Sequence, residues 1–239
     1  MGAVTRKGQT VRRPAGSWTP LVQRLMAESR RRGLDFVPAP LGVDDRGREV
    51  IEFVEGDVGV YPMPAWVWSD DLLVDVAHAL RKLHDTTATL GLPQSGWRRD
   101  PVDPPEVICH GDVAPYNTVC RSGRLIAFID WDYAVPGPRG WDLGYAAYRW
   151  IPLTRERHPD GHTGTRAEEE RRLDLFCAEY GNADAGDVLN WAVHRLDDLV
   201  SYSTQRAAVG DAAFQRTIEL GHVALYERDA AWIRETYAT

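Results

Sequence analysis

The chain has 239 residues, of which 44% are hydrophobic and 26% are charged, a composition typical of a globular protein rather than a disordered one. The formal net charge of −7 argues against a general nucleic-acid binder, whose surface is basic, and is compatible with a cationic substrate. No apolar run reaches the ~18 residues of a membrane-spanning helix, so we expect no membrane partner. Three cysteines make no even disulfide framework, which favours reduced, buried thiols and a cytoplasmic location.

The first part of the chain, residues 1–56, is predicted to be a small β-rich unit. Two short strands flank Gly8 and Gln9, and a helix follows over residues 17–33, closed by a glycine. A strand pair turning at residues 45–47 then leads to Gly56. The unit is therefore expected to be a small β-sheet with one helix.

Residues 57–239 are predicted to be larger and mainly helical. The clearest helix spans residues 69–86, where Ser69 is a good N-cap and apolar side chains recur on one face. Residues 107–132 indicate strand, loop, strand, a turn at Ser122–Gly123, and strand. Three long helices are expected near 167–180, 187–208 and 211–237. The fold class is therefore α+β, with two lobes and a cleft between them.

The segment 107–132 reads VICHGDVAPYNTVCRSGRLIAFIDWD and combines acids with two apolar runs. Asn117 lies five residues after Asp112, and a tight hairpin returns the chain so that Asp130 comes beside Asn117. Asn117 and Asp130 together offer oxygen ligands to one hard cation, while Asp112 stays on the loop to accept a proton from a hydroxyl. Phosphoryl transfer needs this division of labour.

The pattern H-G-D-x4-N, followed by I-D-W-D and G-W-D-L, resembles the aminoglycoside phosphotransferase family, small-molecule kinases with the protein-kinase fold. The resemblance implies that Asp112 is the catalytic base and that Asn117 and Asp130 bind Mg²⁺. It also implies that His110 and Asp142 support the catalytic loop. Asp132 is a weaker candidate for a second metal contact.

The same resemblance implies ATP as co-substrate. The run GREVIEFVEG is similar to the strand and hinge that hold adenine through backbone groups, which assigns Glu52, Phe53 and Val54 to ATP binding. No glycine-rich G-x-G-x-x-G precedes it, so the N-lobe is expected to be truncated. The usual strand lysine is replaced by arginine: Arg12 is the expected phosphate contact and Arg13 the second choice. A glutamate partner on the next helix is not evident, and Gln23 is nearest its place.

The sequence thus predicts a bacterial, ATP- and Mg²⁺-dependent phosphotransferase. It would move the γ-phosphate to a hydroxyl of a small molecule such as an aminoglycoside-like antibiotic, an amino alcohol or a sugar. Asp197 and Asp198 either face a cationic substrate or lie on a solvated helix face, the latter being favoured. Two alternatives remain open: a kinase-fold pseudoenzyme or binding protein without transfer, and a nucleotide-sugar transferase using the D-x-D at 130–132. The sequence does not predict the acceptor or the oligomeric state.

Overall fold

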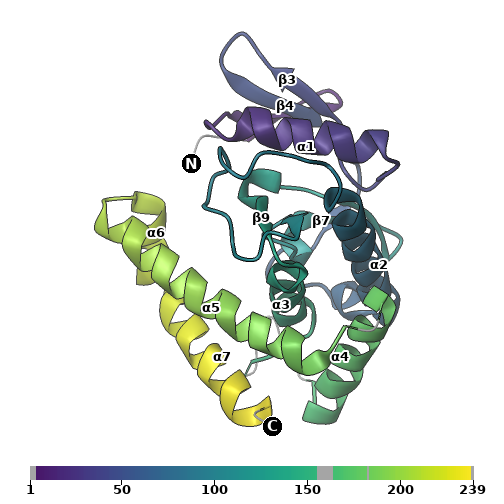
Figure 1. The fold of residues 1–239 in the computed structure, drawn as a ribbon, viewed down its shortest axis with the longest axis vertical. Coiled ribbons are helices and arrows are strands. Elements are labelled where there is room, and N and C mark those ends of the chain that lie inside the picture. Colours follow the sequence, from purple (N-terminus) through teal and green to yellow (C-terminus); the bar gives the residue numbers. More distant parts are fainter. Residues whose placement is uncertain (1–3, 155–163, 182, 238–239) are drawn as a thin grey trace.

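The computed structural model describes residues 4–154, 164–181 and 183–237. Its N-terminal part is a four-stranded antiparallel sheet in the order β1-β2-β4-β3. The sheet lies against helix α1 (Thr19–Arg31), at the top of Figure 1. The strands are β1 (Thr5–Lys7), β2 (Thr10–Pro14), β3 (Pro40–Val43) and β4 (Arg48–Glu52). The predicted strands around Gly8–Gln9, the helix and the strand pair are all confirmed.

The register between β2 and β4 decides which side chains of the sheet can meet. Arg13 lies opposite Glu49 and Arg12 lies opposite Val50. Because successive side chains of a strand point to opposite faces, Arg12 and Arg13 lie on opposite faces of the sheet. Helix α1 covers one face of the sheet with the fully buried Val22, Leu25 and Met26.

Two small sheets and one long helix start the second part of the chain. Helix α2 (Asp70–Thr87) begins at Ser69, whose hydroxyl accepts a hydrogen bond of 3.3 Å from the Leu72 N–H, as the sequence predicts. Its apolar face is fully buried, and each such leucine or valine contributes about 1.5–3 kcal/mol. The sheets are β5-β7-β8 and β6-β9, built from β5 (Asp57–Val58), β6 (Val107–Cys109), β7 (Thr118–Arg121), β8 (Arg124–Phe128) and β9 (Val135–Gly137).

The remaining described residues are mainly helical. Helix α5 packs on both α3 and α7 and runs diagonally across the lower half of Figure 1. The helices are α3 (Arg139–Trp150), α4 (Arg166–Gly181), α5 (Ala185–Ala208), α6 (Ala212–Glu219) and α7 (His222–Tyr237). The α+β fold class, with a helical C-terminal part, is confirmed.

The expectation of one helix over 211–237 is wrong. The chain makes two helices there, α6 and α7, because Gly221 adopts a φ of 80° that breaks the right-handed path. The Gly221 N–H turns back to the Ile218 carbonyl at 2.9 Å. The break lets α6 leave the axis of α7.

The cysteines, the lengths of the helices and the pairing of β5 can each be compared with the predictions from sequence. All three cysteines are free and buried, as expected. Across the described ranges, no helix is both long and apolar enough to cross a bilayer. Strand β5 pairs with β7 rather than with the N-terminal sheet. We therefore keep residue 56 as the proposed boundary between an N-lobe of residues 1–56 and a C-lobe of residues 57–239.

Candidate active site

Asp142, in the first turn of α3, holds the start of the loop over residues 110–117, the predicted catalytic loop. Its carboxylate accepts hydrogen bonds from the His110 N–H at 2.7 Å and the Gly111 N–H at 2.8 Å. His84 of α2 lies 3.2 Å from the same carboxylate. Burial opposes ionisation of Asp142, but the hydrogen bond and charge of His84 and the loop amides lower its pKa below the ordinary value.

The buried trio His84, Cys109 and Asp142 brings its ligand atoms within 4.8 Å of one another. Both Asp142 oxygens are already used by backbone N–H groups, and His84 also lies 2.8 Å from the Tyr180 hydroxyl. These bonds satisfy the polar atoms without a metal. We interpret the trio as support for the loop.

His110 ties the two ends of the loop together. Its Nδ1 accepts the Asp112 N–H at 3.2 Å, so its Nε2 is the nitrogen that donates to the Ile129 carbonyl at 3.1 Å. Burial lowers the pKa of His110, which agrees with this neutral tautomer. The ring centre lies 4.5 Å from that of Trp131, with the two ring planes tilted by 58°. His110 lies where the predicted structural anchor would be.

Gly111 allows the sharp turn between His110 and Asp112. Its φ is 82°, and a Cβ there would lie 2.1 Å from the Tyr133 carbonyl oxygen, so no larger residue fits. Its own carbonyl accepts a 2.8 Å hydrogen bond from Nη2 of Arg195 on α5. The loop is therefore fixed from both sides by Asp142 and Arg195.

Asp112 is partly buried and is held by its neighbours in the loop. Asn117 Nδ2 donates to one carboxylate oxygen at 2.8 Å, and the Tyr116 hydroxyl donates to the other at 3.3 Å. Burial and the nearby charge of Asp130 raise the pKa of Asp112 to about 6, partly offset by Arg195. A carboxylate with that pKa is a suitable general base near neutral pH.

Asn117 and Asp130 come together as the hairpin prediction required. The Ile129 N–H donates to the Asn117 carbonyl at 2.8 Å, which places Asp130 next to Asn117. Asp130 has a φ of 61°, a left-handed conformation that is strained for a non-glycine residue and is often found at functional sites. Since Asn117 Nδ2 is engaged by Asp112, its Oδ1 is the atom left for a cation. Asn117, Asp130 and the nearby Asp132 form an oxygen donor set that fits Mg²⁺.

Arg13, rather than Arg12, is the arginine that faces this site. Its guanidinium donates to Asp130 at 2.6 Å and to Asp132 at 2.7 Å. Arg12 lies on the opposite face of β2, 3.6 Å from Asp44. The expectation that Arg12 faces the site is therefore wrong, because the parity of the strand turns Arg12 away and brings Arg13 to Asp130 and Asp132.

Glu49 of β4 is the acidic partner that sequence reasoning missed. It is completely buried and accepts a 2.6 Å hydrogen bond from Arg13 Nε, across the strand pair. Gln23 of α1, at the place where a glutamate was sought, donates to Glu49 at 3.3 Å. Burial disfavours a charged Arg13, but Asp132, Asp130 and Glu49 raise its pKa above the ordinary value, so the guanidinium stays charged.

The three residues assigned to adenine binding lie at and after the end of β4. The Glu52 carboxylate accepts the Ala39 N–H at 2.8 Å. The Phe53 N–H donates to the Gln9 carbonyl at 2.9 Å, and Arg6 lies over the Phe53 ring at 3.6 Å. The Phe53 N–H therefore already has a backbone partner. The assignment of adenine binding to Glu52, Phe53 and Val54 stays a prediction.

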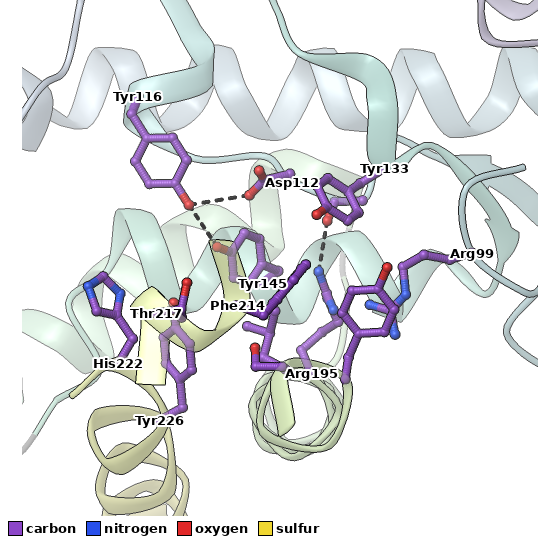
Figure 2. A pocket seen from close by; sticks show the side chains of 14 residues that line it. Arg99, Asp112, Tyr116, Tyr133, Tyr145, Arg195, Phe214, Thr217, His222 and Tyr226 are labelled. Carbon is purple, nitrogen blue, oxygen red and sulfur yellow. Dashed lines mark hydrogen bonds between the residues drawn. The ribbon is translucent and has the colours of Figure 1, made fainter. Parts of the chain in front are cut away.

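A pocket of about 200 Å³ opens directly at Asp112 (Figure 2). The catalytic loop forms one wall, and α3, α5, α6 and α7 form the others. Arg99 and Arg195 also line it. Six tyrosine and phenylalanine rings contribute, together with the imidazole of His222: Tyr116, Tyr133, Tyr145, Tyr202, Phe214 and Tyr226. Its position beside the candidate base suits an acceptor hydroxyl.

Comparison with known protein families supports the predicted resemblance of the segment 107–132 to phosphotransferases. Residues 92–176 match the model of the phosphotransferase enzyme family. The trifolitoxin immunity protein of Rhizobium leguminosarum bv. trifolii is 37% identical over 155 residues, which cover 62% of this chain. The matched region spans 57% of the length of that relative.

Solved structures share the fold at low sequence identity. A choline/ethanolamine kinase family protein from Mesorhizobium loti has a TM-score of 0.62 at 16% identity, covering 98% of this chain and 90% of its own. Macrolide 2'-phosphotransferase MphH from Brachybacterium faecium has a TM-score of 0.57 at 15% identity, covering 97% and 88%. An aminoglycoside phosphotransferase from Streptomyces rimosus, solved with ADP and streptomycin, has a TM-score of 0.53 at 16% identity, covering 77% and 84%. The predicted resemblance to the aminoglycoside phosphotransferase family is confirmed by the match over residues 92–176. The protein-kinase-like fold is confirmed by these structures.

Proposed function

We propose that the chain transfers the γ-phosphate of ATP to a hydroxyl of a small molecule, because residues 92–176 match the phosphotransferase enzyme family and the fold is protein-kinase-like. The observation that carries the proposal is the Asp112 carboxylate. It opens into a pocket on one side and is held by Asn117 beside Asp130 on the other. A base, a cation donor set and an acceptor cavity thus meet at one loop.

The residues divide the reaction between them. Asp112 takes the proton of the acceptor hydroxyl as its oxygen attacks the γ-phosphorus, and the bond from that phosphorus to the β,γ-bridging oxygen breaks to release ADP. Asn117 and Asp130 would hold Mg²⁺, with Asp132 beside them. When bound, Mg²⁺ supplies charge neutralisation at the phosphate oxygens.

Arg13 supports the nucleotide side of the proposal. Its guanidinium pairs with both Asp130 and Asp132, and its planar donors suit phosphate oxygens. Glu49 fixes its position from behind. We propose that Arg13 contacts the phosphates of bound ATP. We also propose that residues 52–54, at and just after the end of β4, contact the adenine.

The names of the relatives give a first set of acceptors to test. Their names concern choline or ethanolamine, macrolides, streptomycin and trifolitoxin, so the acceptors to test are amino alcohols, sugars, antibiotics of these classes and trifolitoxin. Each is incubated with ATP and Mg²⁺, and phosphorylated product is measured by mass spectrometry. Asp112→Asn should lower product formation by about 10²–10⁴-fold. Asp197→Asn, an exposed change on α5, is the matched control.

A pseudoenzyme would give a different result. It would show no product dependent on Asp112 with any acceptor, and no ATP-induced rise in melting temperature. A nucleotide-sugar transferase would bind a UDP-sugar without binding ATP. We favour the kinase over both because Asp112, Asn117 and Asp130 are assembled around one loop. A cytoplasmic location stays a prediction.

A further inference from the structure

The charge of the pocket walls bears on which acceptors can enter. Of the described residues that line the pocket, Asp112 alone carries a carboxylate, whereas Arg99 and Arg195 carry guanidinium groups. An acceptor with several positive charges needs several acidic partners in such a site, since a buried unpaired charge is unfavourable. Asp112 is needed as the base and cannot serve as a permanent partner.

Asp198 is the carboxylate that contacts both of these arginines, and it is already engaged. Arg99 donates to both of its oxygens, at 2.7 and 2.8 Å, and Arg195 donates to one of them at 3.0 Å. One negative charge therefore serves two positive ones, and this trio keeps a net charge of +1. Asp198 has no charge left over to pair with a cationic acceptor.

The aromatic walls do not offset this positive charge. Aromatic faces attract cations, but guanidinium groups of the protein already lie over four of the pocket rings. The distances from guanidinium carbon to ring centre are 4.1 Å for Arg99 over Tyr202, 4.8 Å for Arg195 over Tyr145, 4.4 Å for Arg98 over Tyr133 and 5.2 Å for Arg149 over Tyr116. An acceptor cation would meet these resident cations.

We infer that the Arg99–Asp198–Arg195 trio makes the acceptor pocket selective against positive charge, so that the acceptor is an uncharged or anionic hydroxyl compound with an apolar face. The inference rests on the proposed function, since it takes the pocket at Asp112 to be the acceptor site. It argues against the cationic substrate with which the net charge is compatible. The overall charge of −7 does not describe this pocket.

Binding of three compounds that differ mainly in charge tests the inference without catalysis. The probes are 4-(hydroxymethyl)benzylammonium, 4-(hydroxymethyl)benzamide and 4-(hydroxymethyl)benzoate, titrated by calorimetry or ligand-observed NMR at pH 7.5 without nucleotide or Mg²⁺. We expect the ammonium compound to bind at least about tenfold more weakly than the other two, as an unpaired charge near largely buried cations should. Equal or tighter binding of the ammonium compound overturns the inference, and so does no binding by any of the three.

Two variants should shift the preference in opposite directions. Arg99→Gln removes one guanidinium and should bring the three affinities to within about threefold of one another, while Asp198→Asn frees both guanidiniums and should widen the difference. Arg124→Gln breaks a similar two-bond pair with Asp75 away from the pocket and should change nothing. Circular dichroism verifies folding of each variant.

An unchanged charge preference in folded Arg99→Gln and Asp198→Asn contradicts the role of the trio. The proposed transfer is judged separately, by product formed with ATP and Mg²⁺. Charge selection can therefore fail while transfer is observed, and transfer can fail while charge selection is observed.

Discussion

The catalytic loop and Arg13 hold their functional groups in different ways. Asp112 is bound by side chains four and five residues away, from Tyr116 and Asn117. Arg13 is bound by Glu49, Asp130 and Asp132, which lie 36, 117 and 119 residues away. The proposed base is therefore positioned largely by its own loop, whereas Arg13 is positioned only once the N-terminal sheet lies against the rest of the chain.

This difference separates two kinds of failure. Changes in the loop should abolish chemistry while leaving the fold intact, since the loop backbone is held independently by Asp142 and Arg195. Changes at Arg13 should damage the fold and the nucleotide side together, because Arg13 bridges the N-terminal sheet to Asp130. The predictions below test this contrast.

The largest effect is expected for Asp112→Asn. Loss of the general base should lower turnover of the best acceptor by about 10²–10⁴-fold, the usual contribution of such a group. The melting temperature at pH 7.5 should stay the same or rise, because an ionised and partly buried carboxylate is removed. Initial rates and thermal unfolding measure both effects. A variant that keeps more than a tenth of the wild-type rate would contradict the assignment of Asp112.

The next effect concerns Arg13→Met, compared with Arg12→Met. Removing Arg13 leaves the buried Glu49 without its charged partner, which typically lowers the free energy of unfolding by about 3–5 kcal/mol. Arg12 is 3.6 Å from the partly exposed Asp44, and such a pair is worth about 1 kcal/mol or less. Urea unfolding of both variants measures the difference. Equal losses would show that Arg13 is no bridge between the two regions.

The same contrast explains what the sequence could and could not predict. The hairpin that brings Asp130 to Asn117 was predictable, because the Ser122–Gly123 turn and the flanking apolar runs are local. Whether Arg12 or Arg13 faces the site depends on the parity of one strand, and a shift of one residue exchanges the two faces. Both residues are arginines, so composition gave no guide to the parity.

Glu49 and the pocket were harder to foresee for related reasons. Glu49 becomes the partner of Arg13 through cross-strand register, not through the helix position where a glutamate was sought. Arg99 and Asp198 lie 99 residues apart, and their pairing depends on how α5 packs. The break at Gly221 was readable as a helix-ending glycine, but the flanking apolar pattern continues through it. Tertiary packing decides these features.

A third prediction uses pH to isolate the loop. With the pKa of Asp112 near 6, kcat/KM should fall about tenfold per pH unit below pH 6, because only the ionised carboxylate accepts the proton. The raised pKa means that the folded protein holds this proton more tightly than the unfolded chain. This contribution to the free energy of unfolding should therefore fall as pH rises from about 4 to about 6.

Asp112→Asn supplies the control for that titration. The variant lacks the ionisation, so its free energy of unfolding should gain on the wild type by about 2–3 kcal/mol across the same interval. Urea unfolding at pH 4, 5, 6 and 7 measures the difference. Parallel curves for the two proteins would mean that the pKa of Asp112 is close to its ordinary value and that burial does not raise it.

The smallest effect is expected at Gln23, which braces Glu49 from α1. Its Nε2 donates to Glu49 at 3.3 Å and to the Gly42 carbonyl at 2.9 Å, and its Oε1 accepts the Gly42 N–H at 3.0 Å. Gln23→Met loses these bonds and should lower the free energy of unfolding by about 1–2 kcal/mol. Because Glu49 keeps its 2.6 Å bond to Arg13, turnover should change less than threefold.

Gln215→Met on α6 is the matched control, since that exposed glutamine makes one hydrogen bond to the Ala207 carbonyl. It should change the free energy of unfolding by less than about 0.5 kcal/mol. A large loss of turnover in Gln23→Met with little loss of stability would mean that Gln23 orients Arg13 through Glu49. The helix would then share the role that the strand residue Glu49 is proposed to fill, and the phosphate side would depend on α1 as well as on the β2–β4 register.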